Sequence, residues 1–168
     1  MMRKRDECMI KSFQNTIPDL PDKVKTKDFN LIENFDIDKW SSSVSGSNFY
    51  FNDYAEEEEI HHLDGQTIEE AEHQIATRLY QNNARVHFNQ HIEKSGRFGK
   101  RIIYGGYIIS LARAISCNGL ANTFKLAAIH SGKHSAPTFA GDTIYAWSKI
   151  LEKEIIPVSY THLTLPTI

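Results

Sequence analysis

The chain has 168 residues, which is enough for one ordinary domain and too few for two complete ones. Its 40% hydrophobic and 24% charged residues are typical of a globular protein, and a net charge of −2 gives no general attraction to nucleic acid or anionic lipid. No apolar run approaches the roughly 20 residues that cross a bilayer, and the basic start lacks the apolar segment of a signal peptide.

The first 46 residues differ in composition from the rest of the chain. They are polar and mixed in charge, so we predict that residues 1–46 are a loose or disordered extension without relation to the domain at 47–156. The two cysteines lie far apart and form no CxxC pair. This pattern favours a reducing, cytoplasmic environment, with Cys117 as a small buried side chain and Cys8 in the extension.

The first regular element of the domain is predicted after a short turn. Asp64-Gly65 is a turn signal, and Thr67 with Glu70 has the spacing of a capping box. Apolar residues then recur at intervals of three and four, which predicts an amphipathic helix over residues 68–80.

A second helix is predicted from Gly105 to Cys117, and it differs in kind from the first. Apolar side chains surround its axis and Arg113 is its only charge, so we expect it to be buried on most sides. Asn118-Gly119 suits its C-terminal end.

Two strand-like runs come after this helix, at residues 124–129 and 143–152. They are separated by Pro137 and a turn at Gly141-Asp142. Such a short sheet leaves an apolar edge open, which favours a fragment of a longer protein. The last stretch, 157–168, reads PVSYTHLTLPTI and is similar to a translated sequencing adapter of assembled environmental DNA, so we expect a non-native tail.

The order of these features resembles the MaoC-like branch of the hot-dog fold. The resemblance rests on Tyr104-Gly105-Gly106 before an apolar helix, on Gly96–Gly99, and on the run Phe139–Thr143. The last two are similar to tandem hydratases of the mesaconyl-CoA and β-methylmalyl-CoA type. It implies an α+β fold in which a curved antiparallel sheet wraps a central helix. It also implies water addition or removal at the 2,3 double bond of an enoyl-CoA thioester.

The family's acid–base motif, Asp-x-Asn-Pro-x-His, aligns with residues 82–87. His87 stands at the histidine position and is the candidate acid or base, whereas Asn82 replaces the aspartate. Asparagine cannot exchange a proton, and loss of such a group costs about 10²–10⁴ in rate. The alternative is that His87 only forms a structural hydrogen bond.

Two further groups of residues are candidates for thioester binding. The resemblance implies that Gly105 or Gly106 donates a backbone N–H to the thioester oxygen at a helix N-terminus; the alternative is close helix packing. Arg97, Lys100 and Arg101 form a basic cluster that either meets the phosphates of coenzyme A or is a solvated loop.

Metal binding is not expected from the histidines. His87 with His91, and His130 with His134, have helical spacing but no acidic or cysteine partner at a zinc-like distance along the chain. The second pair flanks Gly132, which indicates a strand bulge. The acidic run at 56–59 is expected to be solvated. No metal and no redox cofactor is therefore predicted; coenzyme A enters as part of the substrate.

Three functions remain open at this stage. The first is the N-terminal half of an acyl-CoA hydratase or dehydratase with a mesaconyl-CoA-like substrate. The second is a non-catalytic half that binds acyl-CoA and packs on a catalytic half or in a homodimer; Asn82 favours it, so the residues leave open whether this piece is itself an enzyme. The third, a thioesterase, is disfavoured because residues 97–118 contain no Asp or Glu.

Overall fold

The structure is a computed structural model that describes Lys25 and residues 36–123, 125–157 and 162–167. Most of the predicted extension, together with Phe124, therefore lies outside the described residues. The elements in chain order are η2 (Ile37–Lys39), α1 (Ser42–Ser45), η3 (Phe51–Asp53), β1 (Glu59–Thr67), α2 (Glu70–Leu79), η4 (Arg85–His87), α3 (Gln90–Glu93), α4 (Gly105–Ile115), α5 (Cys117–Leu120), β2 (Thr143–Lys149), β3 (Glu152–Pro157) and β4 (His162–Thr167).

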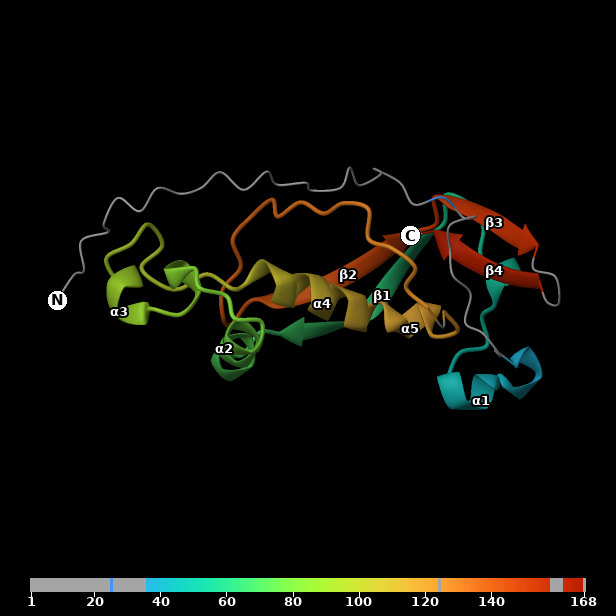
Figure 1. The fold of residues 1–168 in the computed structure, drawn as a ribbon, viewed down its shortest axis with the longest axis horizontal. Helices are drawn as coiled ribbons and strands as arrows, with labels where there is room; N and C mark the ends of the chain where they lie inside the picture. Colours follow the sequence, from blue (N-terminus) through green and yellow to red (C-terminus); the bar gives the residue numbers. More distant parts are fainter. Residues whose placement is uncertain (1–24, 26–35, 124, 158–161, 168) are drawn as a thin grey trace, which may run out of the picture.

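β1 and β2 form an antiparallel ribbon that runs beside α4 (Figure 1). Their register shifts between His62 and Gln66, which places Asp64 and Gly65 inside β1. The turn predicted there is wrong. Because Gly65 has no side chain, the ring of Tyr145 occupies the space above it, and a Cβ at Gly65 would lie 2.5 Å from that ring. The strand thus continues past Gly65 with an irregularity.

The helix predicted at 68–80 is confirmed as α2, but the apolar face predicted for it is wrong: Ala71, Ile75 and Leu79 are exposed, and the buried residues are His73, Gln74, Ala76 and Thr77. Its N-terminal cap also lies two residues later than predicted. The Glu69 N–H donates to the Glu72 carboxylate at 3.5 Å, and Glu69 is the N-cap residue. Thr67 still belongs to β1, and its hydroxyl lies 2.8 Å from that of Thr143 on β2. The sheet pairing therefore takes Thr67 away from the helix.

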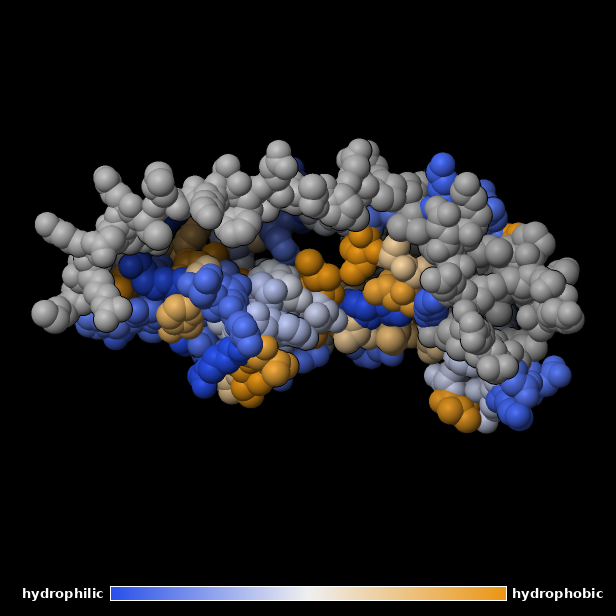
Figure 2. Space-filling model, viewed as in Figure 1, coloured by the Kyte–Doolittle hydropathy of each residue, from blue (hydrophilic) through white to orange (hydrophobic). Residues whose placement is uncertain are grey.

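The core lies between α4 and the ribbon. Ile68, Ile103, Leu111 and Ile115 are buried together. The expectation that α4 is buried on most sides is wrong, since Ile109 is 44% exposed, and Cys117 is likewise exposed rather than buried. Among the described elements, the β1–β2 ribbon packs against this helix, with smaller contacts from α2 and α5. Figure 2 shows hydrophobic residues at the surface over α2 and beside the C-terminal half of α4.

The strand predictions hold only in part. Residues 125–130 form no strand, and none of the described strands pairs with them. Without a strand there is no bulge at His130–His134, so that expectation is also wrong. The run 143–152 divides instead: β2 ends at Lys149 and β3 begins at Glu152. Between them Ile150 is fully buried, and its N–H donates to the Glu58 carbonyl at 3.0 Å.

The architecture is α+β with antiparallel strands, as predicted. Asn122 links the turn after α5 to the segment at 40–49. It accepts from Trp40 Nε1 at 3.1 Å and donates to the Ser47 and Phe49 carbonyls at 3.0 and 2.7 Å. These contacts hold the chain on both sides of position 46 against the turn after α5.

Among the described residues, no helix combines the length and apolarity needed to span a bilayer.

Candidate functional site

A cavity of about 550 Å³ opens at the N-terminal end of α4. Segments distant in the sequence meet there, because the Ile103 N–H donates to the Thr138 carbonyl at 2.9 Å and joins the loop before α4 to the loop before β2. The described lining residues are Asn82, His87, Phe98, Ile102, Ile103, Tyr104, Gly105, Gly106, Ile108, His134, Ser135, Ala136, Pro137 and Thr138. The cavity therefore unites the predicted acid–base segment with the predicted glycine turn.

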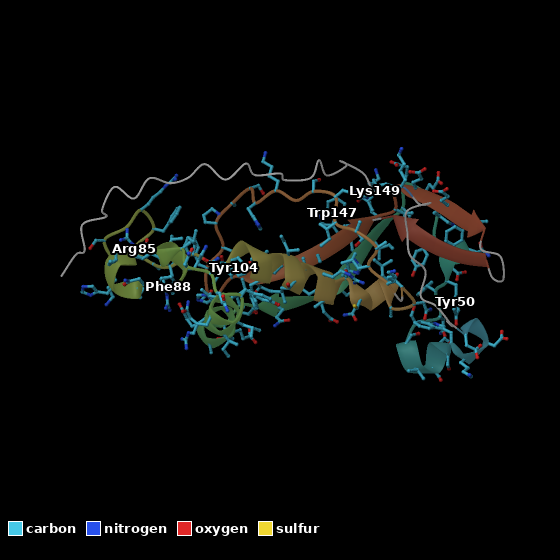
Figure 3. All side chains as sticks on the ribbon, viewed as in Figure 1. Tyr50, Arg85, Phe88, Tyr104, Trp147 and Lys149 are labelled. Carbon is cyan, nitrogen blue, oxygen red and sulfur yellow. The ribbon has the colours of Figure 1, made fainter. Side chains whose placement is uncertain are left out.

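His87 is held at the end of η4 with one ring nitrogen engaged. Its Nδ1 lies 3.0 Å from the Ile102 carbonyl oxygen, which can only accept, so Nδ1 carries the proton. The neutral ring then has an unprotonated Nε2. The ring also makes an edge contact with Tyr104, with centroids 5.9 Å apart. Figure 3 shows Tyr104 at the start of α4. This tautomer suits a general base.

Asn82 lines the same cavity, but its oxygen serves the backbone. Its Oδ1 accepts from the Ala84 N–H at 2.9 Å, and its own N–H donates to the Thr77 carbonyl at 3.0 Å. These bonds turn the chain from α2 toward η4. An amide in this position can orient a ligand through Nδ2, but it cannot accept or release a proton.

The glycine turn is closely packed on the cavity side. A Cβ at Gly105 would lie 2.5 Å from His134 Nε2, and a Cβ at Gly106 would lie 2.6 Å from the Tyr104 ring. Both glycines belong to the first turn of the 11-residue helix α4, where backbone N–H groups lack helical partners and the dipole favours negative charge. The turn can therefore stabilise a developing oxyanion.

His134 is a site residue that the sequence-based reasoning missed. It is an exposed side chain in the loop before β2, yet it contacts Gly105 and lines the cavity. In the sequence, its spacing of four residues from His130 carries no sign of contact with the glycine turn. No periodicity marks it, because only the folding of the loop over α4 brings it to the glycine turn.

The three basic residues separate into two groups. Arg97 and Lys100 lie over the rings of Phe98 and Phe139, 5.1 and 4.2 Å from the respective centroids, and Phe98 lines the cavity. Arg101 instead pairs with Glu70, and its Nη1 donates to the Phe88 carbonyl at 3.3 Å. Arg97 and Lys100 thus remain at the cavity edge, whereas Arg101 is tied into the structure.

Behind the cavity, α2 contributes a buried polar pair. His73 is fully buried, and its Nε2 lies 3.0 Å from Glu70 Oε2. Burial lowers the pKa of His73 below its usual value, although the Glu70 carboxylate opposes this shift. Gln74 Nε2 lies 3.2 Å from His73 Nδ1 and donates to the His87 carbonyl at 2.6 Å.

Within the described residues, no three His, Cys, Asp or Glu side chains cluster as metal ligands would.

The chain is similar to two curated proteins over most of its own length. No protein-family model matches it. Beta-methylmalyl-CoA dehydratase of Chloroflexus aurantiacus is 55% identical over 157 residues, which are 94% of this chain and 44% of that protein. Mesaconyl-CoA hydratase of Cereibacter sphaeroides is 44% identical over 153 residues, which are 91% of this chain and 43% of that protein.

Solved structures agree in fold. The crystal structure of a MaoC domain protein dehydratase from Chloroflexus aurantiacus has a TM-score of 0.78 and 55% identity, covering 92% of this chain and 44% of that chain. A monoamine oxidase regulatory protein from Archaeoglobus has a TM-score of 0.53 at 24% identity over 65% of this chain and 74% of that chain, which shows the fold alone.

The extent of these matches has two consequences. The chain spans less than half the length of the curated relatives it matches. A match over 94% of the chain also reaches well into residues 1–46, so the expectation that this extension is unrelated to the family is wrong.

Proposed function

Because this chain belongs to the MaoC-like family of hot-dog proteins, we propose that its cavity binds an acyl-CoA thioester and takes part in hydration or dehydration at the 2,3 double bond. The observation that carries the proposal is the meeting of His87, Gly105 and Gly106 in one cavity. The names of the relatives favour a mesaconyl-CoA-like substrate. The reaction consumes or releases only water and transfers no electrons, so it needs no redox cofactor, and the residue roles proposed below use no metal.

In the proposed hydration, each group at the cavity has one role. The N–H groups of Gly105 and Gly106 hold the thioester oxygen at the start of α4, where negative charge develops as water adds to C3. His87 Nε2 takes a proton from that water, and the electron pair of the double bond moves to C2. His134, in its protonated form, delivers a proton to C2. Exchange with solvent restores both histidines, and dehydration takes the reverse path.

Coenzyme A is assigned to the aromatic edge of the cavity. Arg97 and Lys100 meet its phosphates, while Phe98 and Phe139, with ring centroids 5.6 Å apart, support the two cations. Arg101 is left out of this assignment because Glu70 and Phe88 already engage it.

A second function is favoured by Asn82 alone. If the proton transfers need a carboxylate, this chain holds the acyl-CoA while another hot-dog half, in a longer chain or in a homodimer, performs the chemistry. The cavity lining among the described residues includes no carboxylate. This argues equally against the thioesterase alternative, which requires one to activate water.

Hydration of mesaconyl-CoA by the purified chain tests the proposal. We expect turnover that falls about 10²–10⁴-fold in His87→Ala, whereas the exposed His91 serves as control and His91→Ala retains the rate. Calorimetric binding of a saturated acyl-CoA is measured in parallel. Binding without turnover supports the holding role, and the absence of both overturns the proposed function.

A further inference from the structure

The backbone at the end of η4 is held by hydrogen-bond donors from α2 and from the segment before α4. Three consecutive carbonyls at the end of η4 are each bonded: the Val86 carbonyl accepts from the Ile102 N–H at 3.2 Å, the His87 carbonyl from Gln74 Nε2 at 2.6 Å, and the Phe88 carbonyl from Arg101 Nη1 at 3.3 Å. Such carbonyls have no partner within a short 3₁₀ turn. The position of His87 therefore depends on these three donors.

The contacts of Gln74 define the protonation state of His73. Gln74 Nε2 has two hydrogens; one goes to the His87 carbonyl, and the other goes to His73 Nδ1, 3.2 Å away. His73 Nδ1 must then be an acceptor, while Nε2 donates to Glu70 at 3.0 Å. Both nitrogens are accounted for only when His73 is neutral.

A proton on His73 Nδ1 would oppose the Gln74 amide, since two donors would face each other. Gln74 would have to turn its oxygen toward His73, which brings that oxygen toward the His87 carbonyl and removes the bond. His73 is 0% exposed and Gln74 is 8% exposed, so water cannot readily replace the lost partner.

We propose that Gln74 and neutral His73 are positioning residues for His87, and that protonation of His73 releases the η4 turn. The titratable and charged groups that face His73 are Glu70 on its own helix, Arg101 from the loop before α4, and His87 on η4. The catalytic consequence rests on the proposed function. The structural coupling does not.

Two variants separate the parts of this pair. Glutamine in His73→Gln has both an acceptor and a donor but does not titrate. It therefore removes the response to protonation while it preserves the hydrogen bonds of neutral His73. Gln74→Met keeps the length and volume of the side chain and removes the bond to His87. Gln66→Met, at an exposed position of β1, is the matched control.

The experiment is a pH titration of the whole chain by NMR, monitoring the His87 carbonyl carbon and ring nitrogens together with the His73 ring. We expect the wild-type His87 signals to show a second transition at the pKa of His73. This transition is lost in His73→Gln and Gln74→Met and retained in Gln66→Met.

Signals of His87 that show a single transition in the wild type, unchanged by His73→Gln, overturn the proposal. His73→Gln decides the matter by itself if Gln74→Met does not fold. Hydration rates are recorded on the same samples. Absence of both turnover and acyl-CoA binding with the NMR coupling intact refutes the proposed function alone, whereas loss of the coupling refutes this inference alone.

Discussion

Two histidines show how hydrogen bonding separates a structural side chain from a reactive one. His62 is buried on β1 with both ring nitrogens engaged, Nδ1 at 2.5 Å from the Asn118 carbonyl and Nε2 at 2.9 Å from Ser148 Oγ. His87 uses only Nδ1 and presents the rest of its ring to the cavity. The first can contribute stability only, and the second retains a nitrogen for chemistry.

Replacement of His62 by leucine should destabilise the fold without changing the cavity. It leaves the Ser148 hydroxyl and the Asn118 carbonyl without their partner, which costs about 1–3 kcal/mol. Urea denaturation measures the free energy of unfolding. The adjacent His61, whose side chain is 73% exposed, is the matched control, and equal losses in His62→Leu and His61→Leu would refute the assignment.

Gly105→Ala should reduce activity while leaving stability unchanged or slightly higher. Alanine favours a helix by up to about 1 kcal/mol relative to glycine, but its Cβ would lie 2.5 Å from His134 Nε2 and displace that ring. We expect a fall in hydration rate on the order of 10²-fold, as for a displaced general acid. Gly132→Ala, with nothing within 4 Å of its Cβ, should keep the rate.

At the scale of elements, the contact between α2 and α4 positions the cavity. Tyr107 on α4 donates to the Glu72 carboxylate on α2 at 2.9 Å. Burial, together with this hydrogen bond as the smaller cause, raises the pKa of Tyr107 to about 12. His73 and Gln74 lie on the same helix, so α2 supports the site at two points.

Tyr107→Phe should weaken the contact between α2 and α4, because it removes the hydrogen bond to Glu72. We expect a loss of about 0.5–1.5 kcal/mol at neutral pH, and a double-mutant cycle with Glu72→Gln should show that the two losses are not additive. Because the folded-state pKa is raised, the unfolded chain releases this proton first and stability falls as pH rises above about 10. Denaturation at neutral and alkaline pH checks both effects, and additive losses would contradict the contact.

The buried His73 predicts the opposite pH dependence on the acid side. Burial lowers its folded-state pKa, so below the unfolded value of about 6.5 the unfolded chain binds a proton that the folded chain does not. This stability is present above about pH 6.5 and is lost as the pH falls below it. His73→Gln should flatten the curve of unfolding free energy against pH, whereas the exposed His91→Gln should leave it unchanged.

Across the molecule as a whole, large apolar side chains remain at the surface of several elements, and α2 and β2 each carry a pair of them. Ile75 and Leu79 on α2 are 63% and 70% exposed, and Tyr145 and Trp147 on β2 are 69% and 61% exposed. Figure 3 places Trp147 on the ribbon formed by β1 and β2. Such patches promote association.

We therefore expect the isolated chain to associate in a concentration-dependent way. Trp147→Lys should lower the association, since it places a charge on the exposed face of β2, while Tyr50→Lys, at a 45% exposed residue away from β2, should not. Sedimentation velocity over a range of concentrations measures this. A monomer at every concentration would contradict the expectation.

Sequence reasoning succeeded where the information is local. The apolar spacing of 68–80 and the apolar run after Gly106 identified α2 and α4, because helical contacts join residues three and four apart. It failed for the strand at 124–129, since a strand needs a partner that periodicity does not name. It also gave no sign of the ion pair between Arg101 and Glu70, because the two residues are distant in sequence.

The family resemblance, the two principal helices and the glycines at the start of α4 can all be recognised in the amino-acid sequence. Each depends on residues adjacent in the chain. Three other facts required the folded molecule: that His134 lies on Gly105, that Gln74 holds the His87 carbonyl, and that Ile109 on α4 and the nearby Cys117 are exposed. They arise where separate segments pack together, and packing across long sequence separations leaves no periodic signal in the chain.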